Sequence, residues 1–348
     1  MLRTRYQNNG RSAIRLGKLQ QQGRQKLIEK IDTEAYLLER VRCAICKSTS
    51  FAALSEKERR GIPATIVICR ECGLVQTNPR MNQEAYNHFY NEEYRLLQAD
   101  ANSRDEIFFN IEQKRGQRIY SYLQKQLGTE ISGKFIVEIG AGAGGILSYF
   151  KDKGNEVYGL DLGKEYVAFG KTRGINIDVG STEKIRELER KPDIILYNHI
   201  IEHFLDPVQE LQKIRDIVGQ GTLLYIAVPG IKNLYQSHEA DFLKYLTITH
   251  VYHYTKTTLA NLFLTQGGFK ILHINEKIDA LIQVDPSIPA REYEKDFEEC
   301  MHFLHKLENS KRKYLSKYMI KTKTINFLKK INSYKAIREL YFKSKRFK

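Results

Sequence analysis

The sequence has 348 residues, of which 42% are hydrophobic and 28% are charged, a composition typical of a folded globular protein with one large or two modest domains. It contains no run of 18 apolar residues, and its first residues lack the apolar segment of a secretory signal, so we expect a cytoplasmic protein without a membrane span. The net charge of +15 lies almost entirely in residues 306–348, where 15 Lys/Arg accompany Glu308 and Glu339, so basicity belongs to a tail and the body is nearly neutral.

Composition and pattern divide the chain into five predicted segments. Residues 1–40 are polar and basic, with a helix expected from about residue 20 to 40, and residues 41–80 are turn-rich and contain paired cysteines. Residues 81–130 have apolar positions at helical spacing and predict a helical connector. Residues 131–290 alternate strands and helices, and residues 291–348 form the basic helical tail.

Four of the five cysteines form two C-x-x-C pairs, which are separated by 22 residues: Cys43, Cys46, Cys69 and Cys72. Two such pairs supply four thiolates for the closed, tetrahedral site of a structural Zn²⁺. A redox dithiol is the alternative, although a single pair would suffice for that chemistry. The spacing therefore predicts a zinc ribbon, and Cys300 is expected to be a buried helix residue.

From residue 131 onward, short apolar runs alternate with amphipathic stretches. Strands are expected at 134–140, 156–161, 175–180, 193–198, 221–229, 269–276 and 279–285, with helices at 145–154, 164–174, 207–218 and 257–268. This order predicts an α/β fold with a Rossmann-like, seven-stranded and mostly parallel sheet that has helices on both faces.

The segment VEIGAGAGG, residues 137–145, lies where the first of these strands turns into a helix. Glycines at such a turn let the backbone approach a ligand closely, and Asp161, which ends the next strand 21 residues after Gly140, suits the hydroxyls of a ribose. The G-x-G-x-x-G spacing also occurs in nicotinamide dehydrogenases. Glu138, however, would repel a pyrophosphate and attract the cationic groups of S-adenosylmethionine, so it favours the methyl donor.

On these motifs, residues 133–283 resemble the class I S-adenosylmethionine-dependent methyltransferases. The resemblance implies that the glycine segment and the end of the second strand bind the donor, and that residues 181–182 lie near its adenine. The implied donor-binding residues are Glu138, Gly140, Ala141, Gly142, Gly144, Asp161, Leu162, Ser181 and Asn198, with Thr182 beside Ser181.

The decapeptide NHIIEHFLDP, residues 198–207, contains the H-x-x-E-H string of one class of zinc peptidase. Here the string follows an apolar strand, and a new helix begins at Asp206-Pro207, so it does not lie within one long catalytic helix. The end of such a strand is instead a ligand-binding edge of the sheet. We therefore interpret the string as part of a methyltransferase site.

Transfer of a methyl group to a hydroxyl, amine or carbon acid requires loss of a proton, for which a histidine is a suitable base. The candidates are His199, Glu202 and His203 after the strand, and His250 and His253, which the resemblance puts on the substrate side. A structural role is the alternative, with Glu202 accepting backbone hydrogen bonds and His203 packed under the sheet. In a further alternative, Glu202 helps to hold a divalent ion, as in some quinone O-methyltransferases of this fold.

The segment that begins at Cys72 resembles the N-terminal zinc-ribbon region of bacterial sugar and nucleotide-sugar methyltransferases. Its sequence is CGLVQTNPRMNQEAYNHFYNEEYR. The resemblance implies that Tyr86, Tyr90 and Tyr94 line a sugar-nucleotide pocket, while aromatic packing between the ribbon and the catalytic domain is the alternative. The C-methyltransferases of that group carry a further substantial C-terminal domain, and here only a short basic region follows. Methylation of a sugar oxygen is therefore expected as readily as methylation of carbon.

In the tail, the apolar residues Ile325, Leu328, Ile331, Tyr334, Ile337 and Tyr341 recur every three or four positions among lysines. A basic amphipathic helix of this kind can lie on an anionic membrane, can contact RNA phosphates, or can pack on its own domain. Contact with the inner face of the membrane would suit a lipid-linked glycan acceptor.

The sequence thus predicts an S-adenosylmethionine-dependent methyltransferase with a structural Zn²⁺, acting on a sugar, nucleotide-sugar or glycan in surface polysaccharide biosynthesis. An RNA methyltransferase is an alternative because of the ribbon and the tail, although NHIIEH differs from the N-P-P-Y loop used on base amino groups. A non-catalytic zinc-ribbon adaptor is a second alternative, which the intact glycine segment disfavours.

Overall fold

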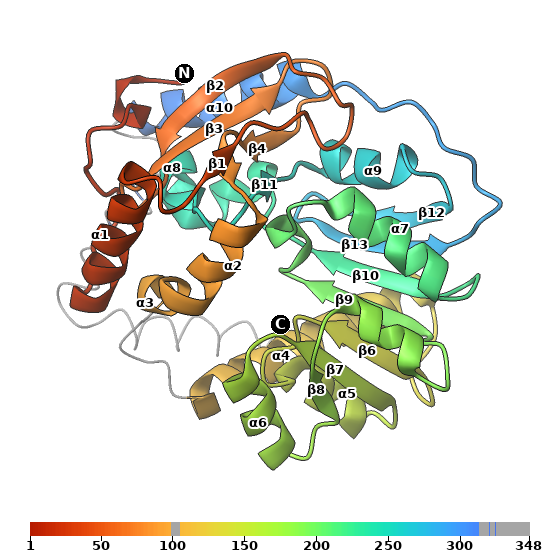
Figure 1. Ribbon diagram of the computed structural model, residues 1–348. Helices are drawn as coiled ribbons and strands as arrows, with labels where there is room; N and C mark the ends of the chain where they lie inside the picture. Colours follow the sequence, from red (N-terminus) through yellow and green to blue (C-terminus); the bar gives the residue numbers. More distant parts are fainter. Residues whose placement is uncertain (99–104, 313–319, 321–323, 325–348) are drawn as a thin grey trace.

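The computed structural model describes residues 1–98, 105–312, 320 and 324 (Figure 1). A seven-stranded sheet forms the centre of residues 105–291, which we call the catalytic half after the role predicted for it. Its strand order is β12-β13-β10-β9-β6-β7-β8, and only β13 runs antiparallel to its neighbours. The strands are β6 (Phe135–Ile139), β7 (Glu156–Asp161), β8 (Ile177–Val179), β9 (Ile194–Asn198), β10 (Leu223–Ala227), β12 (Phe269–Ile274) and β13 (Asp279–Val284). The predicted Rossmann-like, mostly parallel sheet is confirmed.

Helices cover both faces of this sheet, so its central strands are buried on both sides. Ile136 and Leu196 point into a core shared with one set of helices, whereas the adjacent Val137 and Ile195 point into the core on the opposite face. The first set comprises α4 (Asp105–Leu127), α5 (Gly145–Asp152) and α6 (Lys164–Thr172), and the second comprises α7 (Pro207–Ile217) and α9 (Lys256–Leu264).

A smaller, four-stranded sheet contains the ribbon and lies beside the catalytic half (Figure 1). Three of its strands, β2 (Phe51–Lys57), β3 (Pro63–Cys69) and β4 (Val75–Thr77), are consecutive in the chain. The fourth, β11 (Tyr252–His253), comes from the catalytic half and pairs with β4. The side chains buried in the ribbon and those on the α7 and α9 face of the large sheet form one continuous hydrophobic core.

The N-terminal helix is shorter than predicted. Helix α1 (Lys18–Asp32) ends where Glu34 adopts a left-handed conformation, with φ of 57°, and the Tyr36 amide turns back to donate to the Lys30 carbonyl at 2.9 Å. The expectation of a helix to residue 40 is therefore wrong. The chain instead continues into β1 (Leu38–Glu39), which pairs with β5 (Arg80–Met81).

Short helices connect the ribbon to the catalytic sheet. Helix α2 (Gln83–Glu92) begins at Asn82, whose side chain accepts a hydrogen bond from the Ala85 amide at 2.9 Å, an N-cap of the usual kind. Helix α3 (Tyr94–Gln98) follows α2, and the short α8 (Phe242–Tyr245) precedes β11 in the catalytic half. These helices bring aromatic side chains between the two sheets.

Helix α10 (Phe297–Arg312) returns the chain to the N-terminus. It buries Cys300, as predicted, and its Glu308 accepts hydrogen bonds from the Tyr6 hydroxyl at 2.7 Å and from Arg5 at 2.5 Å. The basic amphipathic helix predicted over residues 325–341 lies outside the described residues, so its contact with a membrane or glycan stays a prediction. Within the described part of the chain, we find no helix long and apolar enough to cross a membrane.

Candidate functional site

A left-handed glycine bend closes the carboxyl end of β6. Gly140, Gly142 and Gly144 have φ of 70°, 55° and 76°, a conformation that favours glycine. Asp161, at the end of β7, accepts hydrogen bonds from the amides of Gly142 at 2.8 Å and Gly163 at 2.7 Å. Asp161 therefore fixes the shape of the bend, and since each carboxylate oxygen has a second lone pair, it can still accept hydrogen bonds from a ligand.

Negative charge gathers behind this bend. Glu138, the residue before the last of β6, is 2% exposed, and its Oε2 atom has no hydrogen-bond partner among the described residues. Burial, then the nearby carboxylates of Glu112 and Asp161, raise the pKa of Glu138 well above its usual value, while Arg115 opposes this effect. Burial likewise raises the pKa values of Glu112 and Asp161. The glycine bend and these three carboxyl groups mark the candidate ligand site, which we call the crevice, where a bound cation would offset their mutual repulsion.

Apolar side chains surround the mouth of the crevice. Leu162 follows Asp161 and is 77% exposed, and Phe108 and Tyr166 are also partly exposed, with ring centroids 6.2 Å apart. Phe108 lies next to the bend, since a Cβ placed on Gly142 would be 3.7 Å from its ring. A planar, partly apolar group such as an adenine would cover these side chains.

The remaining residues predicted to bind the donor differ in their surroundings. Ala141 is buried within the bend, and Asn198 is the last residue of β9. Ser181 is exposed after β8, whereas the Thr182 hydroxyl donates to the buried carboxylate of Glu210. Ser181 is therefore available to a ligand, and Thr182 belongs to a buried structural contact.

The loop after β9 packs directly against the glycine bend. A Cβ on Gly140 would lie 2.6 Å from the Ile200 Cδ1 atom, so a larger residue would require the Ile200 side chain to move. The preceding residue, His199, adopts φ of 56°, a strained conformation for a residue with a side chain. Its imidazole is 40% exposed, and its Nδ1 atom lies 3.5 Å from Glu202 Oε1. His199 thus faces solvent beside the crevice with a carboxylate behind it.

Three imidazoles surround the buried carboxylate of Glu202. Besides His199, the Nε2 atoms of His203 and His250 each lie 4.0 Å from Glu202 Oε1. Glu202 is 1% exposed, and neither of its oxygens has a hydrogen-bond partner among the described residues. Burial lowers the pKa of His203, an effect that Glu202 opposes, and it lowers the pKa of His250 well below its usual value. Both rings are therefore neutral near pH 7.

His253 lies behind this cluster. It is 1% exposed on β11, its ring centroid is 5.9 Å from that of His250, and burial lowers its pKa to about 3. Both of its ring nitrogens lack partners among the described residues. The structure thus brings His199, Glu202, His203 and His250 together and leaves His253 one layer deeper.

The three tyrosines of the connector lie over the histidines. The Tyr90 hydroxyl is 2.7 Å from His203 Nδ1, and the Tyr86 hydroxyl donates to the Thr249 carbonyl at 3.0 Å. Tyr94 stacks on Tyr90 with ring centroids 4.7 Å apart. Two of these tyrosines are therefore hydrogen-bonded between connector and catalytic half, as the packing alternative requires, and their place in a sugar-nucleotide pocket stays a prediction.

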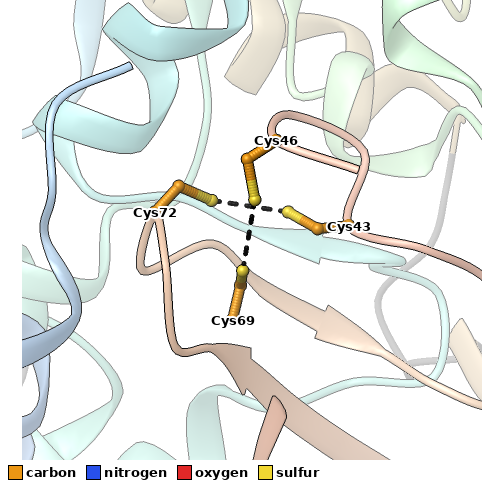
Figure 2. Close-up of side chains that lie close together, drawn as sticks. All are labelled: Cys43, Cys46, Cys69 and Cys72. Atoms are coloured by element: carbon orange, nitrogen blue, oxygen red, sulfur yellow. Dashed lines mark hydrogen bonds between the residues drawn. The ribbon is translucent and has the colours of Figure 1, made fainter. Parts of the chain in front are cut away.

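The four paired cysteines converge at the end of β3 (Figure 2). Cys43 and Cys72 have Sγ atoms 3.4 Å apart, as do Cys46 and Cys69, and all four side chains point toward one another. Three of the four are buried. This arrangement of four sulfur atoms is one that could hold a metal ion.

A cavity of about 410 Å³ lies between the ribbon and the loop after β9. Its lining comes from the N-terminal segment, α1, the ribbon strands, α2 and the catalytic half, and it includes Asn8, Glu56, Thr65, Thr77, Arg80, Tyr86, Leu205 and Val251. Leu205 and Val251 adjoin the two histidine segments in the sequence, so the cavity, whose lining is mainly apolar with a few polar side chains, lies close to them.

Sequence reasoning missed Glu112 and Phe108 because they reach the crevice through the packing of α4 on α5. Gly116 was the feature of the sequence that could have indicated this packing, because a glycine within a helix often marks a close helix contact. A Cβ at Gly116 would lie 2.7 Å from the Ile146 carbonyl. Gly145 has the reciprocal contact, since its Cβ would lie 2.5 Å from the Phe109 carbonyl. These two glycines let the helices approach closely enough to bring Glu112 near Glu138.

Residues 111–274 match a family model described as a methyltransferase domain. The chain therefore carries a methyltransferase domain, which spans just under half of its length. No curated protein matches the sequence.

Two solved structures illustrate the wider likeness. An S-adenosylmethionine-dependent methyltransferase from Clostridium acetobutylicum has a TM-score of 0.38 at 13% identity, over 57% of this chain and 99% of that one. One from Mesorhizobium loti has a TM-score of 0.36 at 16% identity, over 47% of this chain and 94% of that one. Both likenesses are distant, and the assignment depends on the family match.

The Glu138→Gln variant tests whether the Glu138 carboxyl group lacks a stabilising partner in the folded protein. The pKa of Glu138 is higher in the folded protein than in the unfolded chain, so ionisation of Glu138 destabilises the fold. The free energy of unfolding of wild type is therefore highest at low pH and falls as the pH rises toward that folded-state pKa. The amide cannot ionise, so we expect the Tm of the donor-free variant to exceed that of wild type by a larger margin at about pH 8 than at about pH 5, two values above the ordinary pKa of a glutamate. Differential scanning calorimetry measures both values.

The matched control is Glu210→Gln, because Glu210 is buried but accepts a hydrogen bond from Tyr197 at 3.1 Å. That variant is expected to lose stability, since it weakens existing hydrogen bonds. A lower Tm for Glu138→Gln at both pH values would show that the carboxylate has a partner in the folded protein.

Proposed function

We propose that the methyltransferase domain of this chain binds S-adenosylmethionine at the glycine bend and methylates a sugar or nucleotide-sugar. One observation carries the first part: Glu138, Glu112 and Asp161 gather behind the bend, and Glu138 Oε2 has no partner among the described residues. An unpaired buried carboxylate is costly, so a ligand that supplies positive charge is favoured. S-adenosylmethionine offers a sulfonium and an ammonium group.

The donor-binding residues take distinct roles in this proposal. Asp161 accepts hydrogen bonds from the ribose hydroxyls, Glu138 binds the cationic amino-acid end, and Leu162 packs against the adenine beside Ser181. The glycines keep side chains out of the space that the donor occupies. A dinucleotide fits poorly, because its pyrophosphate would meet three carboxylates.

His199 is the proposed general base. It is the exposed imidazole of the cluster, it adjoins the glycine bend through Ile200, and Glu202 lies behind its Nδ1 atom. A carboxylate in that position stabilises the imidazolium that forms when the base accepts a proton. His203 and His250 are partly buried, His253 is buried, and all three serve to arrange the site around Glu202.

A sugar acceptor is supported by the cavity between ribbon and catalytic half. Its mainly apolar lining carries a few hydroxyl, amide and guanidinium side chains, which could hydrogen-bond to the hydroxyl groups of a sugar that packs against the apolar part. Tyr86 lines the cavity, and the neighbouring Tyr90 contacts His203, so an acceptor held there would extend toward the histidines. Surface polysaccharide biosynthesis is the proposed setting.

The four cysteines are proposed to bind a structural Zn²⁺. Tetrahedral thiolate sites of this kind stabilise small ribbons that have little core of their own. Strand β11 adds to the ribbon sheet, and the Thr77 amide donates to the Val251 carbonyl at 2.9 Å. Zinc would thereby fix the position of the adjacent His250.

Asp161→Asn is expected to weaken S-adenosylmethionine binding by about 100-fold, because the amide both loses the charge and disturbs the bend. Isothermal titration calorimetry gives the Kd. Asp178→Asn is the control, since Asp178 lies on β8 in a partly exposed ion pair with Lys171. Equal binding by Asp161→Asn and wild type would count against this crevice as the donor site.

Cys69→Ser is expected to lose the zinc ion and with it methyl transfer, while donor binding changes only a few-fold, because no ribbon residue forms the glycine bend. Elemental analysis of the purified protein gives the zinc content, and calorimetry gives the donor affinity. Cys300→Ala is the control with an intact cluster and should retain one equivalent of zinc there. Retention of that zinc by Cys69→Ser would refute the assignment.

His199→Ala is expected to lower kcat by about 100-fold or more at unchanged donor affinity, as expected for loss of a general base. The assay follows methyl transfer from labelled donor to a panel of nucleotide-sugars. His302→Ala, on the exposed face of α10, is the control and behaves as wild type. Transfer to RNA, with none to any sugar, would contradict the proposed acceptor.

A further inference from the structure

The carboxylate of Glu202 has an environment that the role of His199 does not explain. It is 1% exposed, both of its oxygens lack hydrogen-bond partners among the described residues, and it faces the imidazoles of His203 and His250. Buried polar groups without partners indicate a missing ligand, water or ion. A carboxylate with two imidazoles is a ligand set found in divalent metal sites.

The spacing of these three groups fits a shared ion better than direct hydrogen bonds. Nε2 of both histidines lies 4.0 Å from Glu202 Oε1, which is too long for a hydrogen bond. One ligand atom from each of the three residues lies within 4.8 Å of the others. Ligands about 2.1 Å from a metal in tetrahedral geometry are about 3.4 Å apart, so a small inward movement would complete the site.

The surroundings also orient the ligands. The Tyr90 hydroxyl lies 2.7 Å from His203 Nδ1, which leaves Nε2 directed toward Glu202. A hydrogen bond on the second ring nitrogen is the usual support of a metal-binding histidine. Glu202 and His203 belong to η3 (Ile201–His203), while His250 is held by the segment that enters β11. The ligands therefore come from two segments, joined by the hydrogen bond from the Val251 amide to the Glu202 carbonyl at 2.9 Å.

We propose that Glu202, His203 and His250 bind one divalent transition-metal ion, separate from the ion of the four cysteines. The nitrogen and oxygen ligands suit Zn²⁺, Mn²⁺, Co²⁺ or Fe²⁺, whereas the four thiolates select zinc. Three protein ligands leave at least one coordination position for water or an acceptor oxygen. His199 lies outside this set of three and remains free to act as a base. The site goes beyond the proposed function and does not depend on it.

The test is a count of Zn²⁺ bound by the tag-free full-length chain. Wild type, Glu202→Gln and His250→Ala are equilibrated with the same free Zn²⁺ concentration, and bound metal is measured by elemental analysis and titration calorimetry. We expect each variant to hold one equivalent less than wild type. The measured quantity is the difference in bound Zn²⁺ between wild type and each variant. It does not depend on whether the four-cysteine cluster is filled, because that cluster is the same in all three proteins.

Two controls separate this site from loss of folding. Glu210→Gln alters another buried carboxylate, and His305→Ala removes an exposed histidine of α10; both should bind as much Zn²⁺ as wild type. S-adenosylmethionine binding and Tm show that Glu202→Gln and His250→Ala are folded. Equal Zn²⁺ content in wild type, Glu202→Gln and His250→Ala would overturn the proposal, and loss of donor binding in wild type would concern only the proposed function.

Discussion

A cluster of buried carboxyl groups whose ionisation is unfavourable is the constraint around which the catalytic half is arranged. Glu138 sits inside the sheet edge with one oxygen unbonded among the described residues, and Glu112 and Asp161 add to its repulsion. Such a group costs stability, and proteins keep such groups mainly at functional sites. The left-handed glycines let the backbone turn in front of this group, and the close approach of α4 to α5 brings Glu112 near it.

The ribbon is part of the site because one of its strands comes from the catalytic half. The pairing of His253 with Val75, and of Tyr252 with Gln76, ties the segment after His250 to the ribbon sheet. One hydrophobic core extends through both parts, so the ribbon cannot move independently of the loop that it supports. A structural metal at the cysteines would then act on the chemistry at a distance, through the position of His250.

Most of the large sheet could be predicted from the sequence, because its buried strands are continuous apolar runs separated by glycine turns. The cysteine cluster followed from spacing, and Glu138 and Asp161 followed from their position relative to Gly140. Contacts between distant segments could not be predicted in this way. The pairing of β11 with β4, the approach of Glu112 and the bond from Tyr90 to His203 depend on tertiary packing, which leaves no local pattern. The end of α1 was missed because Glu34 takes a left-handed conformation that is uncommon outside glycine and asparagine.

The most direct measurement of the central claim is titration calorimetry of the wild-type protein with S-adenosylmethionine in buffers of different ionisation enthalpy. If the crevice holds its carboxyls partly protonated until a cation arrives, donor binding releases protons and becomes tighter as the pH rises. The neutral thioether product, which lacks the sulfonium, should bind more weakly and release fewer protons. Binding of a dinucleotide in place of the donor, or donor binding without proton release, would contradict the account.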